Sequence, residues 1–167
     1  MKNFILTFVF FFTINLCCVG QIDSHVLEFN VGKTTKKEVV RILQQKYYSP
    51  DATNMFDDGE SINVFKSIKL WGCEWRIITF DFRKGILYQI HFSYWDKNTL
   101  HILNLFDTVL SKLNNVYGRY NITKNPQSLF QQLRDDTFSI NLSTLSIDGM
   151  DSLDLTFTDL ILYNQIP

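Results

Sequence analysis

Residues 77–95 read IITFDFRKGILYQIHFSYW, two runs of alternating apolar and polar side chains joined by a short connection. Ile78, Phe80 and Phe82 share one face of the first run. The corresponding apolar face of the second run holds Ile86, Tyr88, Ile90, Phe92 and Tyr94. A period of two is typical of a strand with one buried face, and residues 83–85 (Arg-Lys-Gly) form a tight connection. This stretch therefore predicts an antiparallel hairpin.

A third strand is predicted before this hairpin. Val64, Ile68 and Leu70 share a face in the same alternating sense, and residues 71–73 (Trp-Gly-Cys) supply a turn. The three segments together predict an antiparallel meander.

One helix is predicted before the meander in the sequence and another after it. Thr35 and Glu38 have the spacing of a capping box, in which a hydroxyl and a carboxylate satisfy free helix N–H groups. Apolar residues then recur with helical period, which predicts a helix over about 35–47. Residues 96–99 offer N-cap candidates for a longer helix over about 99–117, whose broad apolar stripe should pack on a sheet. Gly118 is expected to form a left-handed C-terminal cap.

The C-terminal part of the chain predicts a short helix and two strands. Asn125 and Pro126 resemble an N-cap and first helical position, and the apolar residues that follow, Leu129, Phe130 and Leu133, predict a short helix. Residues 138–142 and 153–157 alternate as strands, with Asp148-Gly149 as a turn between them. The predicted order is α-β-β-β-α-α-β-β. This order is typical of a two-layer α+β domain with helices packed on one face of an antiparallel sheet.

The N-terminus has the layout of a secretory signal peptide. Lys2 precedes a short apolar run, and Cys18 and Gly20 are small residues at −3 and −1 of a cut after Gly20. We therefore expect residues 1–20 to be a signal peptide and residues 21–167 a single domain. An uncleaved anchor and a lipid anchor at Cys17 or Cys18 remain alternatives.

Composition argues against two classes of partner, nucleic acid and anionic lipid. Removal of residues 1–20 leaves 147 residues with 15 Lys+Arg and 17 Asp+Glu. This balance disfavours a nucleic-acid partner and offers no basic patch for anionic lipid. Of the three cysteines only Cys73 lies in the mature chain, so no internal disulfide is expected.

A helix that follows Gly-Lys-Thr and a meander whose middle strand holds Trp-x-x-x-x-Phe form a unit over residues 26–94. Its marker residues are Phe29, Val31, Gly32, Lys33, Thr34, Glu38, Val39, Leu43, Trp75, Phe80, Phe82 and Leu87. This unit resembles the β-lactamase-inhibitor-protein-like fold and the SmpA/OmlA (BamE-like) envelope lipoproteins. The chain is also similar to small exported, uncharacterised proteins of the Bacteroidetes. It lacks the clear lipidation cysteine of the envelope lipoproteins and the Gly-x-Pro turn that follows their first helix. The resemblance implies binding to another protein, and it assigns no binding residue.

The sequence contains four candidates for chemistry. Gly32-Lys33-Thr34 ends like a phosphate-binding loop, but the glycine required five residues earlier is Leu27. Cys73 is a candidate nucleophile if His91 approaches it from the neighbouring strand, and a packed core thiol otherwise. Two acidic clusters lack calcium-loop spacing and are interpreted as solvated turns, with cation binding left open: Asp57, Asp58 and Glu60, and Asp148, Asp151 and Asp154. We predict no catalytic residue, metal or cofactor.

Four aromatic residues gather near one end of the meander: Trp71, Trp75, Tyr94 and Trp95. They either contact a partner, as Trp and Tyr often do at interfaces, or fill the end of the core. The leading hypothesis is an exported, non-enzymatic binding protein of the bacterial envelope or exterior, with no membrane insertion of the mature domain. It would use the sheet face or this aromatic end to bind another protein. A membrane-tethered envelope assembly or structural lipoprotein is the alternative, and a small secreted hydrolase a weaker one.

Overall fold

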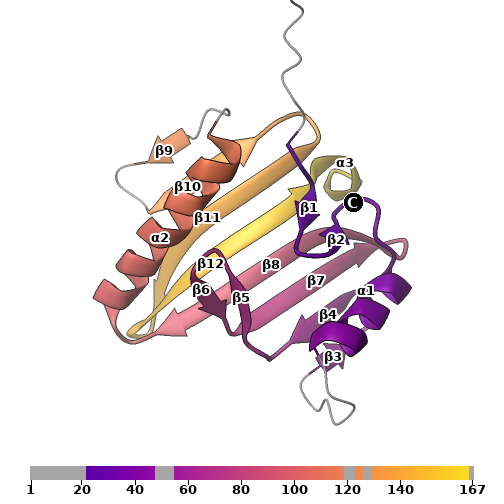
Figure 1. The fold of residues 1–167 in the computed structure, drawn as a ribbon, viewed down its shortest axis with the longest axis horizontal. Helices are drawn as coiled ribbons and strands as arrows, with labels where there is room; N and C mark the ends of the chain where they lie inside the picture. The colour runs from indigo at the N-terminus through magenta and orange to yellow at the C-terminus, as the bar shows by residue number, and fades with distance from the viewer. Residues whose placement is uncertain (1–21, 48–54, 119–122, 126–128, 166–167) are drawn as a thin grey trace, which may run out of the picture.

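A large antiparallel sheet dominates the molecule (Figure 1). The computed structural model describes residues 22–47, 55–118, 123–125 and 129–165. Within these residues, eight strands pair in the order β3-β4-β7-β8-β12-β11-β10-β9. Their bounds are β3 (Met55–Asp57), β4 (Ser61–Val64), β7 (Ile77–Arg83), β8 (Ile86–Asp96), β9 (Thr123–Asn125), β10 (Phe130–Arg134), β11 (Phe138–Ile147) and β12 (Met150–Asp159). The prediction of a mixed fold with an antiparallel sheet is confirmed.

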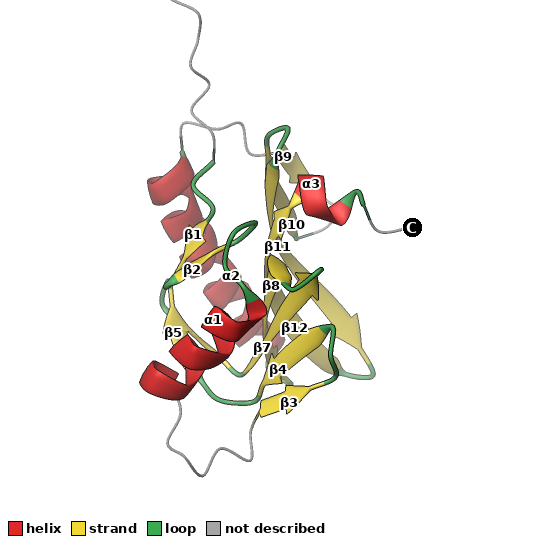
Figure 2. Ribbon diagram, turned by 90° about the vertical axis from the view of Figure 1, so that its right-hand side faces the viewer, coloured by secondary structure: helices red, strands yellow, loops and turns green. Residues whose placement is uncertain are grey.

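Two of the helices lie on the same side of this sheet (Figure 2). They are α1 (Lys36–Ile42), which continues with π-helical hydrogen bonding over Leu43–Tyr47, and α2 (Thr99–Tyr117). The predicted capping box is present, because Glu38 N donates to Thr35 Oγ1 at 3.3 Å and Thr35 N donates to Glu38 Oε2 at 2.8 Å. The third helix, α3 (Leu160–Tyr163), follows β12 directly. In the part of the chain that is described, no helix is both long and apolar enough to cross a bilayer.

Two small hairpins complete the fold: β1 (His25–Val26) with β2 (Phe29–Asn30), and β5 (Ile68–Leu70) with β6 (Cys73–Trp75). The predicted first strand of the meander, which joined Val64, Ile68 and Leu70, is wrong, because these residues belong to two different strands. Val64 ends β4 in the large sheet, whereas Ile68 begins β5 in a separate sheet. The three exposed residues between them, 65–67, break the strand, and the predicted turn at 71–73 closes the small hairpin instead.

The core lies between the large sheet and the elements on its helical side. Apolar residues from β2, β4, β7, β8, β11 and β12 are buried there with residues of α1, its π-helical continuation and α2. Among them are Phe29, Val39, Leu43, Phe80, Phe92, Val109, Leu113 and Phe157. A β-bulge between Asp81 and Phe82 shifts the register of the β7–β8 hairpin. Because of this shift Leu87 is fully buried, and Ile86 and Tyr88, which strict alternation assigned to the core face, are only half-buried.

Of the short helix predicted from Asn125 and Pro126 to Leu133, residues 126–128 lie outside the described residues, and the prediction is wrong for the rest. Residues 130–134 form β10, which pairs with β11 and places Gln131 and Leu133 opposite Leu142 and Ile140. The β11–β12 turn at 148–149 is confirmed, with φ of 52° and 74°.

The left-handed cap predicted at Gly118 is also wrong, since its φ is −61°. Glycine is required there by space, because an added Cβ would lie 2.3 Å from the Asn114 carbonyl oxygen.

Candidate functional site

The face of the large sheet that points away from α1 and α2 is called the open face. Its side chains alternate along β7, β8, β11 and β12 with those of the core, and strand pairing brings them into rows. The central rows are largely polar and comprise Thr79, Asp81, Gln89, His91, Ser93, Ser139, Asn141, Ser143, Ser152, Asp154, Thr156 and Thr158. In Figure 2 α1 and α2 lie on the other side of the sheet, and of the helices only the short α3 lies on this side, near one end.

Asp154 is the centre of a hydrogen-bond network on the open face. Its carboxylate accepts from His91 Nε2 at 3.0 Å, from Ser152 Oγ at 2.6 Å and from Ser93 Oγ. The side chain is 16% exposed. Burial alone raises the pKa of Asp154, but the hydrogen bonds from His91, Ser152 and Ser93 outweigh burial and hold this pKa below its ordinary value. Asp154 is therefore a charged carboxylate.

Asp81 is the second carboxylate of the open face, and its environment raises its pKa, whereas the environment of Asp154 lowers the pKa of that residue. It accepts from Ser61 Oγ at 2.5 Å and from Gln89 Nε2 at 3.3 Å. Burial raises the pKa of Asp81 above its ordinary value, and the hydrogen bond from Ser61 offsets only part of this effect. Among the residues described, neither Asp81 nor Asp154 has a Lys or Arg within ion-pair distance.

Ser93, His91 and Asp154 lie together but lack the geometry of a catalytic triad. In a triad one ring nitrogen of the histidine receives the serine proton while the other donates to the carboxylate. Here Ser93 Oγ and Asp154 Oδ1 both approach the same nitrogen, His91 Nε2, at 3.2 Å and 3.0 Å. The serine also donates directly to the carboxylate. This arrangement stabilises a buried charge and does not activate Ser93 as a nucleophile.

One end of the open face is apolar, and we call it the apolar end. It comprises Ile77, Trp95, Leu145, Ile147 and Met150. Strand pairing aligns Leu145 with Ser152 and Ser152 with Trp95, and it places Ile147 opposite Met150. Leu145 is 53% exposed and Ile147 46% exposed. Large apolar side chains thus face solvent beside the polar centre.

The four aromatic residues identified in the sequence lie on two different sides of the large sheet. Trp75 is fully buried and donates from Nε1 to the Leu70 carbonyl at 3.1 Å. Trp71 is half-buried against Phe157, at 5.7 Å between ring centroids. Tyr94 also lies on the core side, whereas Trp95 belongs to the apolar end of the open face. The four do not form one surface, and their role in partner binding stays a prediction.

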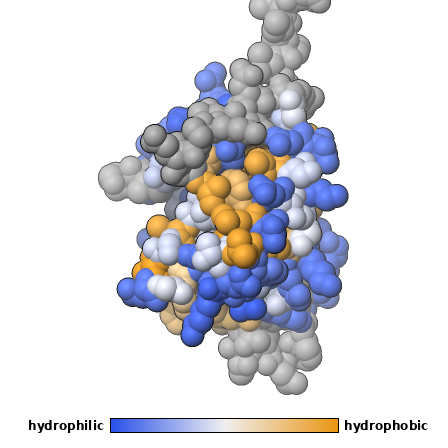
Figure 3. Space-filling model, turned by 90° about the vertical axis from the view of Figure 1, so that its left-hand side faces the viewer, coloured by the Kyte–Doolittle hydropathy of each residue, from blue (hydrophilic) through white to orange (hydrophobic). Residues whose placement is uncertain are grey.

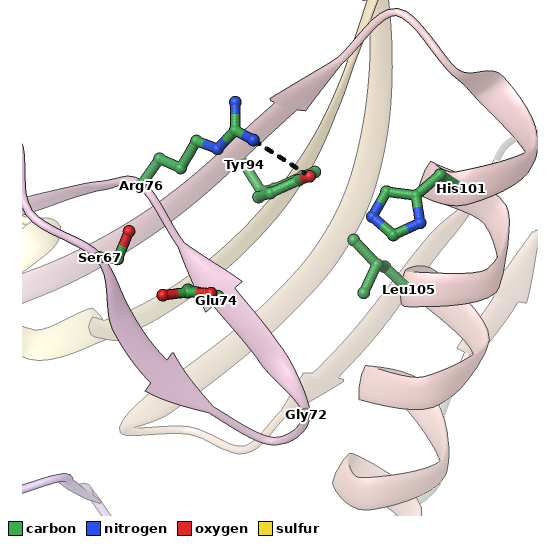
Figure 4. A pocket seen from close by; sticks show the side chains of 7 residues that line it. All are labelled: Ser67, Gly72, Glu74, Arg76, Tyr94, His101 and Leu105. Atoms are coloured by element: carbon green, nitrogen blue, oxygen red, sulfur yellow. Dashed lines mark hydrogen bonds between the residues drawn. The ribbon is translucent and has the colours of Figure 1, made fainter.

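A pocket of about 380 Å³ lies between the β5–β6 hairpin and the first turns of α2 (Figure 4). We call it the hairpin–helix pocket. Its lining residues are Ser67, Gly72, Glu74, Arg76, Tyr94, His101 and Leu105. Figure 4 shows Tyr94 between Arg76 on one side and His101 on the other.

Arg76 and Tyr94 are held together in this pocket. The guanidinium lies 4.7 Å from the centroid of the Tyr94 ring, and Arg76 Nη2 donates to the Tyr94 hydroxyl at 3.4 Å. The hydroxyl in turn donates to Asp96 Oδ2 at 3.2 Å. Burial raises the pKa of Tyr94, and the Arg76 charge opposes this effect. The tyrosine therefore stays neutral.

The proposed thiol nucleophile is not assembled. Cys73 is buried in the core, whereas His91 lies on the open face, on the other side of the sheet. Burial, with a smaller effect of the Glu74 charge, raises the pKa of the Cys73 thiol to about 12. A thiol with this pKa is not a nucleophile at neutral pH.

The acidic clusters and the Gly-Lys-Thr motif have structural roles. Asp57 forms an ion pair with Lys36 at 2.6 Å, and Asp58 accepts turn hydrogen bonds from backbone amides. Asp148 sits in the β11–β12 turn, apart from Asp154. Gly32 N donates to the Leu87 carbonyl at 2.7 Å. Within the described residues, no group of three or more His, Cys, Asp or Glu side chains could hold a metal ion.

Sequence reasoning named the sheet face, Trp95 and Tyr94, but it did not identify the Asp154 network or the hairpin–helix pocket. The polar sides of β7 and β8 were visible as alternation, but the pairing of β8 with β12, which brings Asp154 to His91, was not predicted. The hairpin–helix pocket depends on Arg76, which carries no motif.

Comparison with models of known protein families, with curated proteins and with solved structures found no match. The resemblance to envelope lipoproteins therefore stays a prediction.

Proposed function

We propose that the chain is an exported, non-enzymatic binding protein, and that the open face of a two-layer α+β domain receives another protein. The observation that carries this proposal is the exposure of Leu145, Ile147 and Met150 beside Trp95 on a sheet face that neither α1 nor α2 covers. Exposed apolar patches bordered by polar groups are typical of protein interaction sites.

The charges of the open face indicate the chemistry of the partner. Asp154 is held charged by neutral donors and the imidazole of His91, and no Lys or Arg of the described chain pairs with it. A Lys or Arg of a partner would therefore find, next to the apolar end, a charged carboxylate that pairs with no Lys or Arg of the described residues. We propose a partner that presents apolar side chains to Leu145 and Trp95 and a basic side chain to Asp154.

A second set of exposed apolar side chains provides the matched control. Apolar side chains also gather on the flank of the molecule to the left in Figure 1, where α2 lies (Figure 3). α2 itself has two exposed apolar residues, Leu100 and Val116, and Val116 is 55% exposed, close to the 53% of Leu145. A photo-reactive residue at position 116 thus samples a surface of similar exposure away from the open face.

The test is site-specific photo-crosslinking in cells that naturally produce the chain. A photo-reactive phenylalanine analogue is placed at position 145, 150 or 116, and the crosslinked products are identified by mass spectrometry. The proposal predicts the same partner at 145 and 150 and its absence at 116. Equal crosslinking at all three positions, a partner at 116 alone, or no product at 145 and 150 overturns it.

A further inference from the structure

The hairpin–helix pocket has walls that are fixed before any ligand enters. Trp71, at the tip of the β5–β6 hairpin, contacts Tyr117 of α2 at 6.3 Å and Phe157 of β12 at 5.7 Å between ring centroids. At the neighbouring Gly72 an added Cβ would lie 2.9 Å from Thr108 Cγ2 of α2. The hairpin tip is therefore in contact with the helix, and the pocket opens between the two elements.

The pocket carries two opposite charges that are not paired with each other. Glu74 lies in β6 and Arg76 at the bend that follows this strand, and both line the pocket on either side of the buried Trp75 in the sequence. Within the described chain neither forms an ion pair, although Lys69 lies opposite Glu74 in the hairpin register. Both charges are available to a ligand.

Arg76 is oriented but its hydrogen-bonding capacity is not used up. Its two hydrogen bonds, to the Tyr94 hydroxyl and the Trp95 carbonyl, are both 3.4 Å long. A guanidinium has five N–H donors and binds carboxylates in a bidentate manner. Stacking on Tyr94 restricts its motion, so little conformational entropy is lost when it binds an anion.

The remaining lining is suited to a short apolar group. Leu105 and the ring of Tyr94, which is 8% exposed, provide apolar surface beside the two charges, and the His101 ring lies 5.8 Å from the Tyr94 ring. A volume of about 380 Å³ lies in the size range of small-molecule sites.

We infer that the hairpin–helix pocket binds a small zwitterion of the free amino-acid class. Arg76 binds its carboxylate, Glu74 binds its ammonium group, and its side chain contacts Tyr94 and Leu105. This site is separate from the open face, so its failure would leave the proposed function untouched.

The test uses the purified mature chain and isothermal titration calorimetry. Each common free amino acid is titrated at several millimolar, together with its amide, which lacks the carboxylate, and its N-acetyl form, which lacks the ammonium group. Binding of at least one amino acid is expected, with affinity at least about tenfold weaker for both analogues. Failure of every amino acid to bind, or equal binding of the analogues, overturns the inference.

Two exposed-residue variants locate the binding. Arg76→Gln and Glu74→Gln should each weaken affinity at least about tenfold. Lys69→Gln, on the opposite strand of the hairpin and outside the pocket lining, should leave affinity unchanged. Thermal melting checks that all three variants fold. Unchanged affinity in folded Arg76→Gln or Glu74→Gln contradicts the assignment.

Discussion

Asparagine substitution of the two open-face carboxylates should have opposite effects on stability. In Asp154→Asn the amide retains one acceptor oxygen for the three donors that now reach the carboxylate, from His91, Ser93 and Ser152. Hydrogen bonds to a charged acceptor contribute about 1.5–3 kcal/mol each, and the amide replaces part of this. We expect a loss of about 2 kcal/mol in the free energy of unfolding at neutral pH.

Asp81→Asn is the matched control, since Asp81 lies on the same face with the same change of atoms. Burial disfavours the charged form of Asp81, so a neutral amide removes a penalty. The free energy of unfolding should stay the same or rise by less than about 1 kcal/mol.

The pH dependence has a definite sign for each residue. The pKa of Asp154 is lowered in the folded state, so its stabilisation is present above the unfolded pKa of about 3.9 and is lost as pH falls through the folded pKa. The deficit of Asp154→Asn should therefore shrink in acid. The pKa of Asp81 is raised, so any gain from Asp81→Asn should be absent below the unfolded pKa and appear as pH rises through the folded pKa.

Urea unfolding followed by tryptophan fluorescence measures both effects across the pH range. Equal losses in the two variants, or a deficit of Asp154→Asn that does not change with pH, would refute this reading of the open face.

Three further predictions concern the fold. In urea unfolding, Gly32→Ala should destabilise the protein by about 1 kcal/mol more than Gly59→Ala. Both glycines have positive φ, but only at Gly32 would the new Cβ meet another side chain, Asp159, at 2.2 Å, and so disturb the N-cap of α3. Equal losses in the two variants contradict this. Cys73 should resist alkylation at pH 8 until the chain unfolds, because burial raises its pKa to about 12; rapid labelling of the folded protein contradicts this. Thr35→Ala should cost about 1 kcal/mol through loss of the capping box, and an unchanged urea midpoint would argue against it.

Elements determined by local interactions were predictable from the sequence. α2 was predicted over its observed bounds, because a long apolar stripe and an N-cap residue specify a helix without reference to other segments. The β7–β8 hairpin was also predicted, although the bulge after Asp81 was not. A bulge depends on how the strand bends over the core, and alternation carries no signal for it.

The error at β10 has a clear physical origin. The buried residues of this strand are Gln131 and Leu133, and a buried glutamine does not register as apolar. The visible apolar residues, Phe130 and Leu133, are three apart and therefore fit a helix. Tertiary pairing with β11 determines the strand.

The open-face cluster was unpredictable for a similar reason. His91 and Asp154 are 63 residues apart, and they meet only because β8 and β12 are neighbours in the sheet. The sequence places His91 on the polar side of a strand and Asp154 in an acidic segment, but it does not specify which strands pair.

The central claim, that the open face binds another protein, is tested most directly by the affinity of the crosslinked partner for surface variants. We predict that Trp95→Ala and Leu145→Ser each weaken binding of the purified partner at least about tenfold, as expected for residues at the centre of an interface. Val116→Ser, on the exposed flank of α2, should bind with the affinity of the unmodified chain. Unchanged affinity in the open-face variants, or a loss confined to Val116→Ser, would contradict the account.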